Sequence, residues 1–118
     1  MTERIEVLNK DDVICIIYAD YASCNIHIEN LVEQSGLYIF LLPFGINNHP
    51  TWADYMYYLS TRCFPANRGD AGSILKGLGL REHNPDAIVR KSHGVMNDDF
   101  VWLRYPGETL KFEDVRMR

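Results

Sequence analysis

Apolar and polar residues alternate along the first third of the chain with the period of a β-strand. Ile5 and Val7 alternate with the polar residues Arg4 and Glu6, and residues 13–18 are apolar enough to be buried on both faces of a sheet. Residues 24–29 alternate again, as a half-buried strand does, and the apolar run 37–42 is a fourth possible strand. Short turns separate these segments, so the pattern predicts an antiparallel sheet built from hairpins.

The middle of the chain changes to a helical period. Apolar residues between positions 52 and 59 recur at i, i+3, i+4 and i+7, which predicts a helix with one face turned to the core. Thr51 is the expected N-cap, Asp54 suits the positive end of the helix dipole, and the helix should end near Arg62. The inward residues are Trp52, Tyr55, Met56 and Leu59.

Two shorter helices are predicted after this one. Residues 70–78 carry apolar positions at helical spacing and end at Gly79, a residue that commonly caps helix C-termini. The next helix begins with Asn84 as its cap and Pro85 at its first position, and it stops at Gly94.

Strand alternation returns at 100–105, and residues 110–115 either pair back with that strand or form a short terminal turn. The order of elements indicates an α+β fold. We expect an antiparallel sheet of about four to five short strands, with about three short helices packed on one side of it.

Length and composition bound the class of protein. A chain of 118 residues is expected to fold as a single domain, 1–118. Within it, 1–45 is β-rich, 51–94 is helical and 98–115 is a C-terminal strand region. The longest apolar run is far shorter than the ~20 residues that cross a bilayer, so neither a membrane span nor a membrane partner is expected. Nothing basic precedes an apolar stretch at the N-terminus, so no signal peptide is expected.

The cysteines indicate a reducing compartment. Cys15, Cys24 and Cys63 are odd in number and widely spaced, which does not fit a disulfide framework. Cys15 lies inside an apolar run, where a thiol behaves as a small buried hydrophobic group. We therefore expect a cytoplasmic protein.

Charge is distributed unevenly along the chain. Residues 1–60 hold eight acidic and two basic side chains, a net charge of −6, whereas residues 61–118 hold ten basic and eight acidic ones, a net charge of +2. The modest total argues against non-specific DNA or RNA binding, which needs clustered Lys and Arg. No direct sequence-specific nucleic-acid partner is expected either. The acidic half is expected either to meet a basic partner or to be a solvated sheet edge that resists aggregation.

Metal and cofactor motifs are weak. Cys24 and His27 have a ligand-like spacing, but they fall in a predicted strand, where residues i and i+3 point to opposite faces. The glycines do not form a phosphate-binding loop. We expect no metal and no cofactor.

The chain contains the residue types that a thiol mechanism needs, but no sequence motif that places them close together. Cys63 with His93 and Asp98 or Asp99 would supply a nucleophile, a base and an acid. Alternatively, Cys63 packs beside Phe64 at a helix end. The Asp98–Asp99 pair would bind a cation or act in acid–base chemistry, or it is the turn before a strand. We expect no catalytic residues.

One group of residues favours protein binding. Tyr57 and Tyr58 lie on the predicted helix and are followed by Arg62 and Arg68. If the apolar face of the helix meets the core, Tyr57 points away from the core and Tyr58 lies at the boundary. Tyrosine beside arginine is typical of interface anchors. The predicted partner-binding residues are Tyr57, Tyr58, Arg62, Arg68, Asp98 and Asp99.

Short segments between residues 41 and 115 match a known bacterial pattern in order and spacing. They are 41–45 (LLPFG), 51–59, 62–68 (RCFPANR), 78–80, 93–94, 98–103 and 110–115. In these segments the chain resembles short proteins of Firmicutes mobile elements and phages, and also the N-terminal segment of HipA-like kinases. That segment precedes a kinase domain, so the resemblance implies a docking or regulatory module. Kinase motifs are absent from the chain, so kinase activity is not implied.

The expected function is therefore a non-enzymatic protein-binding module of a phage or mobile element, which occludes or regulates a protein partner in the bacterial cytoplasm. A host defence nuclease or its ribonucleoprotein complex is one such partner, as for anti-CRISPR proteins. The alternatives are a small cysteine-dependent enzyme that uses Cys63 and His93, and a structural homodimer whose sheet edge pairs with a second copy.

Overall fold

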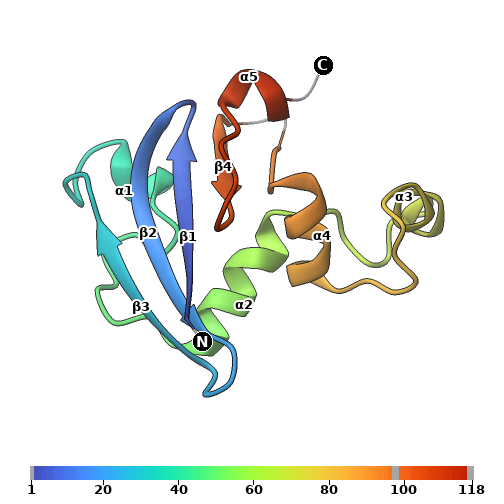
Figure 1. The fold of residues 1–118 in the computed structure, drawn as a ribbon, viewed down its shortest axis with the longest axis horizontal. Helices are drawn as coiled ribbons and strands as arrows, with labels where there is room; N and C mark the ends of the chain where they lie inside the picture. Colours follow the sequence, from blue (N-terminus) through green and yellow to red (C-terminus); the bar gives the residue numbers. More distant parts are fainter. Residues whose placement is uncertain (1, 97–98, 117–118) are drawn as a thin grey trace.

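The computed structural model describes residues 2–96 and 99–116. Within them, a four-stranded antiparallel sheet combines with five helices, three of which have seven or more residues, and this confirms the predicted α+β class (Figure 1). The strands are β1 (Thr2–Asn9), β2 (Asp12–Asp20), β3 (Asn25–Asn30) and β4 (Val101–Arg104). The helices are α1 (Tyr38–Leu41), α2 (Trp52–Thr61), α3 (Ala71–Gly77), α4 (Pro85–Ser92) and α5 (Phe112–Val115).

The sheet has the strand order β3-β2-β1-β4. β1 and β2 form a hairpin whose two-residue turn places Lys10 at a φ of 54°, and a bulge shifts the register between Val7 and Leu8. β4 pairs antiparallel with the other edge of β1, so that Leu103 lies opposite Val7. The last strand of the chain therefore completes the sheet beside the first.

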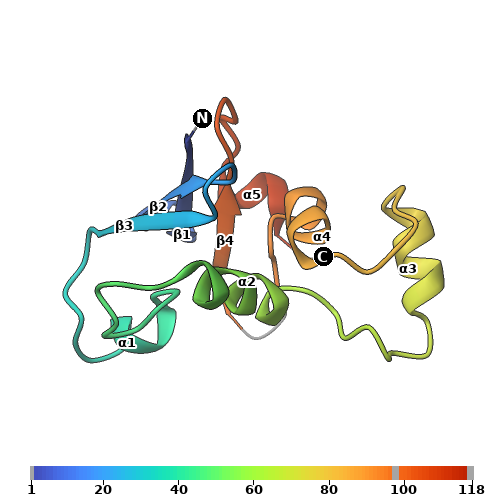
Figure 2. The same ribbon diagram turned by 90° about the horizontal axis from the view of Figure 1, so that it is seen from below.

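One face of the sheet is buried by helices. α2 runs beneath the strands, and α4 lies beside it (Figure 2). Ile5, Val7 and Ile17 of the sheet belong to one buried cluster with Leu59 of α2 and Ile88 of α4. Burying side chains of this size contributes about 1.5–3 kcal/mol each, so this layer is the main source of stability.

The opposite face of the sheet carries polar pairs between neighbouring strands. Glu6 of β1 accepts a hydrogen bond from Nε of Arg104 on β4, at 2.9 Å. Tyr18 lies opposite His27, with their ring centroids 6.0 Å apart. Trp102 is buried on β4, and its indole N–H donates to the carbonyl oxygen of Lys10 at 2.5 Å.

The predicted helix caps are present. The hydroxyl of Thr51 accepts from the N–H of Asp54 at 3.2 Å, and the Asp54 carboxylate accepts from the N–H of Thr51 at 2.8 Å, which forms a capping box. The side chain of Asn84 accepts from the N–H of Ala87, and Pro85 is the first residue of α4. α2 ends one residue before Arg62, as expected.

The expected strand at 37–42 is wrong. This run instead contains the single helical turn α1, closed by a hydrogen bond of 2.8 Å from the N–H of Leu42 to the carbonyl of Tyr38. A short apolar run has no strand period of its own, and here it finds no strand to pair with. Of the two alternatives for residues 110–115, the terminal turn is the one formed, as α5.

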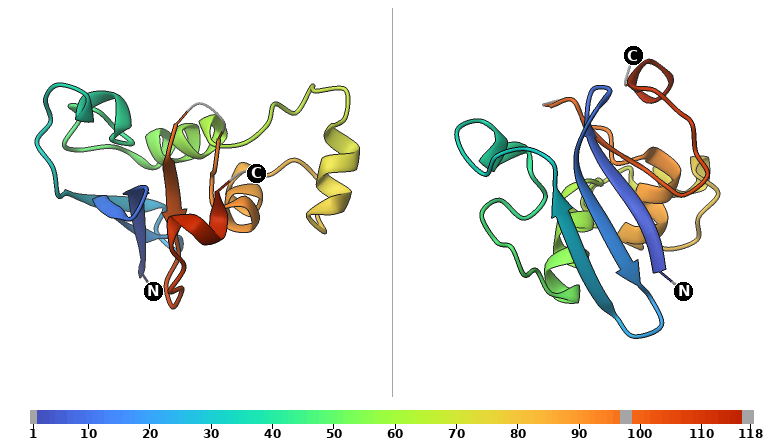
Figure 3. Two further views of the ribbon diagram at one scale, coloured as in Figure 1. Left: turned by 90° about the horizontal axis from the view of Figure 1, so that it is seen from above. Right: turned by 60° about the vertical axis from the view of Figure 1, so that its left-hand side comes forward.

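α3 projects from the rest of the molecule on two extended connections (Figure 3). We call residues 65–82 the α3 arm. Its base is closed by His83, whose Nε2 lies 2.6 Å from the carbonyl oxygen of Phe64 and whose ring meets the Phe64 ring edge-on. No helix in the described ranges is long and apolar enough to span a bilayer.

Candidate functional site

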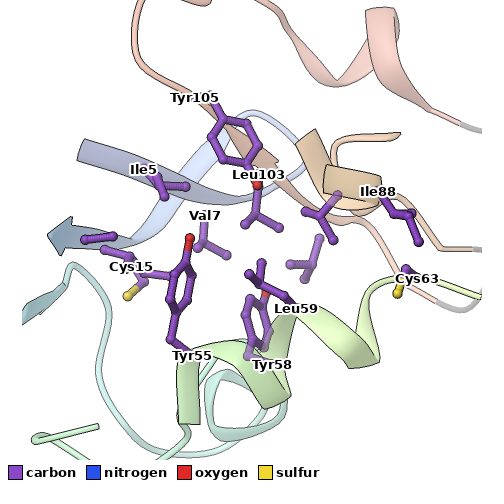
Figure 4. Close-up of a cluster of buried hydrophobic side chains, with 14 of the residues drawn as sticks. Ile5, Val7, Cys15, Tyr55, Tyr58, Leu59, Cys63, Ile88, Leu103 and Tyr105 are labelled. Atoms are coloured by element: carbon purple, nitrogen blue, oxygen red, sulfur yellow. The ribbon is translucent and has the colours of Figure 1, made fainter. Parts of the chain in front are cut away.

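The structure does not bring the predicted partner-binding residues together on one surface. Tyr57 is 72% exposed on the outer side of α2. Tyr58 is only 8% exposed, so its expected position at the surface boundary is wrong; it points into the core beside Leu59 (Figure 4). The reason is helical spacing, because Tyr58 lies three residues after the buried Tyr55 and so shares its face.

Arg62 is also buried, at 7% exposure, and the expectation that it forms an accessible surface is wrong. Its guanidinium donates two hydrogen bonds to the carboxylate of Asp99, at 2.8 and 2.9 Å, and others to the carbonyl oxygens of Gly94 and Val101. Arg62 thereby joins the end of α2 to the start of β4. Asp98, the neighbouring predicted residue, lies outside the described residues.

The ionisation of Asp99 follows from this pairing. Burial tends to raise the pKa of its carboxyl, but the hydrogen bonds from Arg62 and from the N–H of Val101 outweigh burial and hold the pKa below its ordinary value. Asp99 is therefore an anion at neutral pH whose charge is matched within the protein.

Arg68 is exposed on the α3 arm and pairs with Asp70 at 2.6 Å. Together with Arg62 it lines a groove of about 490 Å³ between the arm and the body of the molecule. The groove walls are mostly apolar and include Phe64, Ile74, Leu78, Ile88 and Met96.

Cys63 lines the same groove but is not activated as a nucleophile. Its thiol donates to the carbonyl oxygen of Ser60 at 3.6 Å, and burial raises the pKa of the thiol. Nε2 of His93 instead lies 2.8 Å from a carboxylate oxygen of Glu108. Among the residues described, no hydrogen bond joins Cys63 to His93, so the geometry offers no support for a thiol mechanism.

A polar cluster lies between the sheet and the helices. The hydroxyls of Tyr21 and Tyr55 are 2.7 Å apart, and Tyr21 donates to Asp86 at 3.0 Å. Arg90 donates to Asp86 and to Glu3, which ties α4 to β1. Burial raises the pKa of both tyrosines, so their phenols stay protonated, and the cluster holds elements together rather than providing a base.

One exposed part of the surface is not indicated by the sequence pattern. Residues 31–46, which we call the exposed apolar segment, contribute five of the seven large apolar side chains that are exposed in the described structure. These five are Leu31, Leu37, Tyr38, Phe40 and Ile46. The segment belongs to the long connection between β3 and α2, and such long connections are usually functional or disordered. The missed signal was an apolar run without alternation in a region that lacks a strand partner.

A cavity of about 270 Å³ separates this connection from α2. Pro43, Phe44 and Asn47 form one wall, and Asp54 and Tyr57 of α2 form part of the other. Tyr57, an exposed residue of the predicted site, therefore lies where α2 meets the exposed apolar segment. In the described part of the chain, no group of three or more His, Cys, Asp or Glu side chains is placed to hold a metal ion.

Comparison of the chain with protein-family models, with curated protein sequences and with solved structures finds no significant match. The resemblance to HipA-like N-terminal segments therefore stays a prediction.

Proposed function

We propose that this chain is a protein-binding module that docks on a protein partner through the exposed apolar segment and Tyr57. The observation that carries the proposal is the exposure of large apolar side chains in this region. Phe40 is 85% exposed, Leu37 79% and Ile46 71%.

Exposed apolar side chains do not stabilise the monomer, but they can stabilise a complex in which a partner buries them. Burying a Leu, Ile or Phe side chain is worth about 1.5–3 kcal/mol relative to leaving it in water. Phe40 and Ile46 make no contribution of this kind to the fold, since they are among the most exposed side chains described. Aromatic anchors of this type dominate binding energy at protein interfaces.

The identity of the partner is proposed from the resemblance alone. A regulatory module suggests a kinase-like protein as partner, whereas a mobile-element protein suggests a host defence nuclease. Inhibition of a nuclease requires that the purified chain block cleavage at a near-stoichiometric ratio.

The proposal is tested by affinity capture with matched variants. The wild-type chain, the double variant Phe40→Ser/Ile46→Ser and the control Phe100→Ser are immobilised and exposed to a lysate of the organism that carries the gene. Phe100 is also exposed but lies outside the exposed apolar segment. We expect a specific protein to be retained by the wild type and the control and to be lost from the double variant.

Equal capture by all three proteins would contradict the proposal. Light scattering over a series of protein concentrations tests the alternative that the chain forms a homodimer. A wild-type dimer that the double variant converts to a monomer would show that the segment is occupied by a second copy of the chain.

A further inference from the structure

We infer that the partner segment is cationic, with a Lys or Arg side chain that enters the cavity beside Asp54 and apolar neighbours that pack on the exposed apolar segment. This inference rests on the proposed function and adds the chemistry of the partner to it.

The first support is the charge of the surrounding chain. From residue 11 to residue 61 there is no Lys or Arg, and there are six acidic residues. They are Asp11, Asp12, Asp20, Glu29, Glu33 and Asp54. Within the part of the chain that the structure describes, none of the six forms an ion pair with a basic side chain. This stretch of the chain therefore carries negative charge that no ion pair among the described residues offsets, and Asp54 brings part of that charge to the cavity.

The second support is the size and lining of the cavity. At about 270 Å³ it is smaller than the ~300–1,000 Å³ of typical small-molecule sites, and it suits a single long side chain. Phe44 and Tyr57 offer aromatic surface, while Asp54 supplies a carboxylate at the edge of α2.

Lys and Arg match this lining better than other side chains. Their aliphatic stems pack on apolar surface while the charged end reaches a polar group, here the Asp54 carboxylate. The ring of Tyr57 adds a surface on which a cation is favourable. An acidic segment or a nucleic acid would instead meet like charge, and so would an anionic membrane.

The inference is tested with an unbiased peptide library. Peptides of 16 residues are selected on the wild-type chain, with counter-selection on Phe40→Ser/Ile46→Ser. We expect the selected peptides to be enriched in Lys and Arg and in large apolar residues relative to the unselected library. The affinity of the strongest peptide should fall as salt concentration rises.

Two variants of the capping box then isolate the role of the carboxylate. Thr51→Ala removes the hydroxyl that accepts from the N–H of Asp54, whereas Asp54→Asn keeps an oxygen that can accept from the N–H of Thr51. Only Asp54→Asn removes the negative charge from the cavity. We expect Asp54→Asn to weaken the strongest peptide by about tenfold and Thr51→Ala by less than about threefold, since a charge-assisted hydrogen bond is lost only in the former.

Each of the remaining outcomes would overturn either the cationic partner or the proposed function as well. Selected peptides that depend on Phe40 and Ile46 but lack Lys and Arg enrichment, or equal effects of the two cap variants, would overturn the cationic partner and leave the proposed function standing. A selection that yields no peptide dependent on Phe40 and Ile46 would overturn both. Sedimentation of the wild-type chain, but not of the double variant, with phosphatidylcholine vesicles would replace the protein partner by a lipid surface.

Discussion

Arg62 and Asp99 are 37 residues apart in the chain and form a two-pronged ion pair, with Nη1 2.8 Å from Oδ2 and Nη2 2.9 Å from Oδ1. The same guanidinium donates to the backbone of Gly94 and Val101. One side chain thus satisfies acceptors from the end of α4 to the beginning of β4. Planar, multiply bonded recognition of this kind is specific to arginine.

Removal of this side chain is expected to destabilise the fold. Arg62→Met should lower the free energy of unfolding by about 3 kcal/mol, because it leaves a partly buried carboxylate and two carbonyl groups without their donor. The matched control is Arg68→Met, whose ion pair with Asp70 is exposed and should be worth less than about 1 kcal/mol. Urea unfolding of both variants measures the difference, and equal losses would contradict a structural role specific to Arg62.

The protein is expected to lose stability in acid because two carboxylates that are paired with arginines, Glu6 and Asp99, become protonated. The hydrogen bond from Arg104 lowers the pKa of Glu6, and the bonds from Arg62 and Val101 lower the pKa of Asp99 against the effect of burial. A carboxyl whose pKa is lower in the folded state stabilises the fold above its unfolded pKa of about 4, and this contribution is lost as the pH falls through the folded pKa.

The free energy of unfolding should therefore decline from about pH 5 downward, with the unfolded chain taking up more protons than the folded one. Unfolding by urea at a series of pH values measures this decline. The variant Asp99→Asn should be less stable at pH 7 and should show a shallower acid decline than the wild type. An identical decline in that variant would mean that Asp99 does not contribute.

Both the backbone conformation and the close packing at Gly94 disfavour any side chain there. Its φ is +67°, and a Cβ added there would lie 3.0 Å from Cδ1 of Leu103 and 3.3 Å from Cβ of Arg62. Gly94→Ala should cost about 2–4 kcal/mol of stability, from the left-handed backbone and from overpacking together. Gly79→Ala is the control, since Gly79 has a φ of +76° with no atom within 4 Å of the added Cβ. Its cost should be about 1–2 kcal/mol, from the backbone alone.

Loss of the hydroxyl group is expected to change stability differently at the buried Tyr55 and Tyr58. Among the described residues, the hydroxyl of Tyr58 is buried without a hydrogen-bond partner, whereas that of Tyr55 lies 2.7 Å from the hydroxyl of Tyr21. Tyr55→Phe should lower the free energy of unfolding by about 1 kcal/mol, and Tyr58→Phe should leave it unchanged or raise it. Thermal or urea unfolding compares the pair, and a larger loss in Tyr58→Phe would contradict this assignment.

Features with local signals could be predicted from the sequence. The alternation around Ile5 and Val7 and in 24–29 predicted strands, because one face of each strand packs in or against the buried cluster. Side-chain caps at Thr51 and Asn84 are formed within three residues of the chain, so the helix starts follow from residue type alone.

Features that depend on residues far apart in the chain could not be predicted from the sequence. Nothing near β4 in the sequence specifies that it pairs with β1, and nothing near Arg62 shows that it pairs with Asp99 rather than a partner protein. The pattern of 37–42 predicts a strand wrongly, because apolar runs of this length do not distinguish a strand from a turn of helix. The exposed apolar segment, the centre of the proposed site, was missed for the same reason.

The position of β4 also has a consequence for the order of events during synthesis. Residues 2–30 can form the β1–β2–β3 meander early, but the outer edge of β1 has no neighbour until residues 101–104 leave the ribosome. Pairings between residues so distant in the chain form slowly. Throughout that interval the backbone amides and carbonyls of β1 are open to strands of other nascent chains, and this edge is where we expect misassembly to begin.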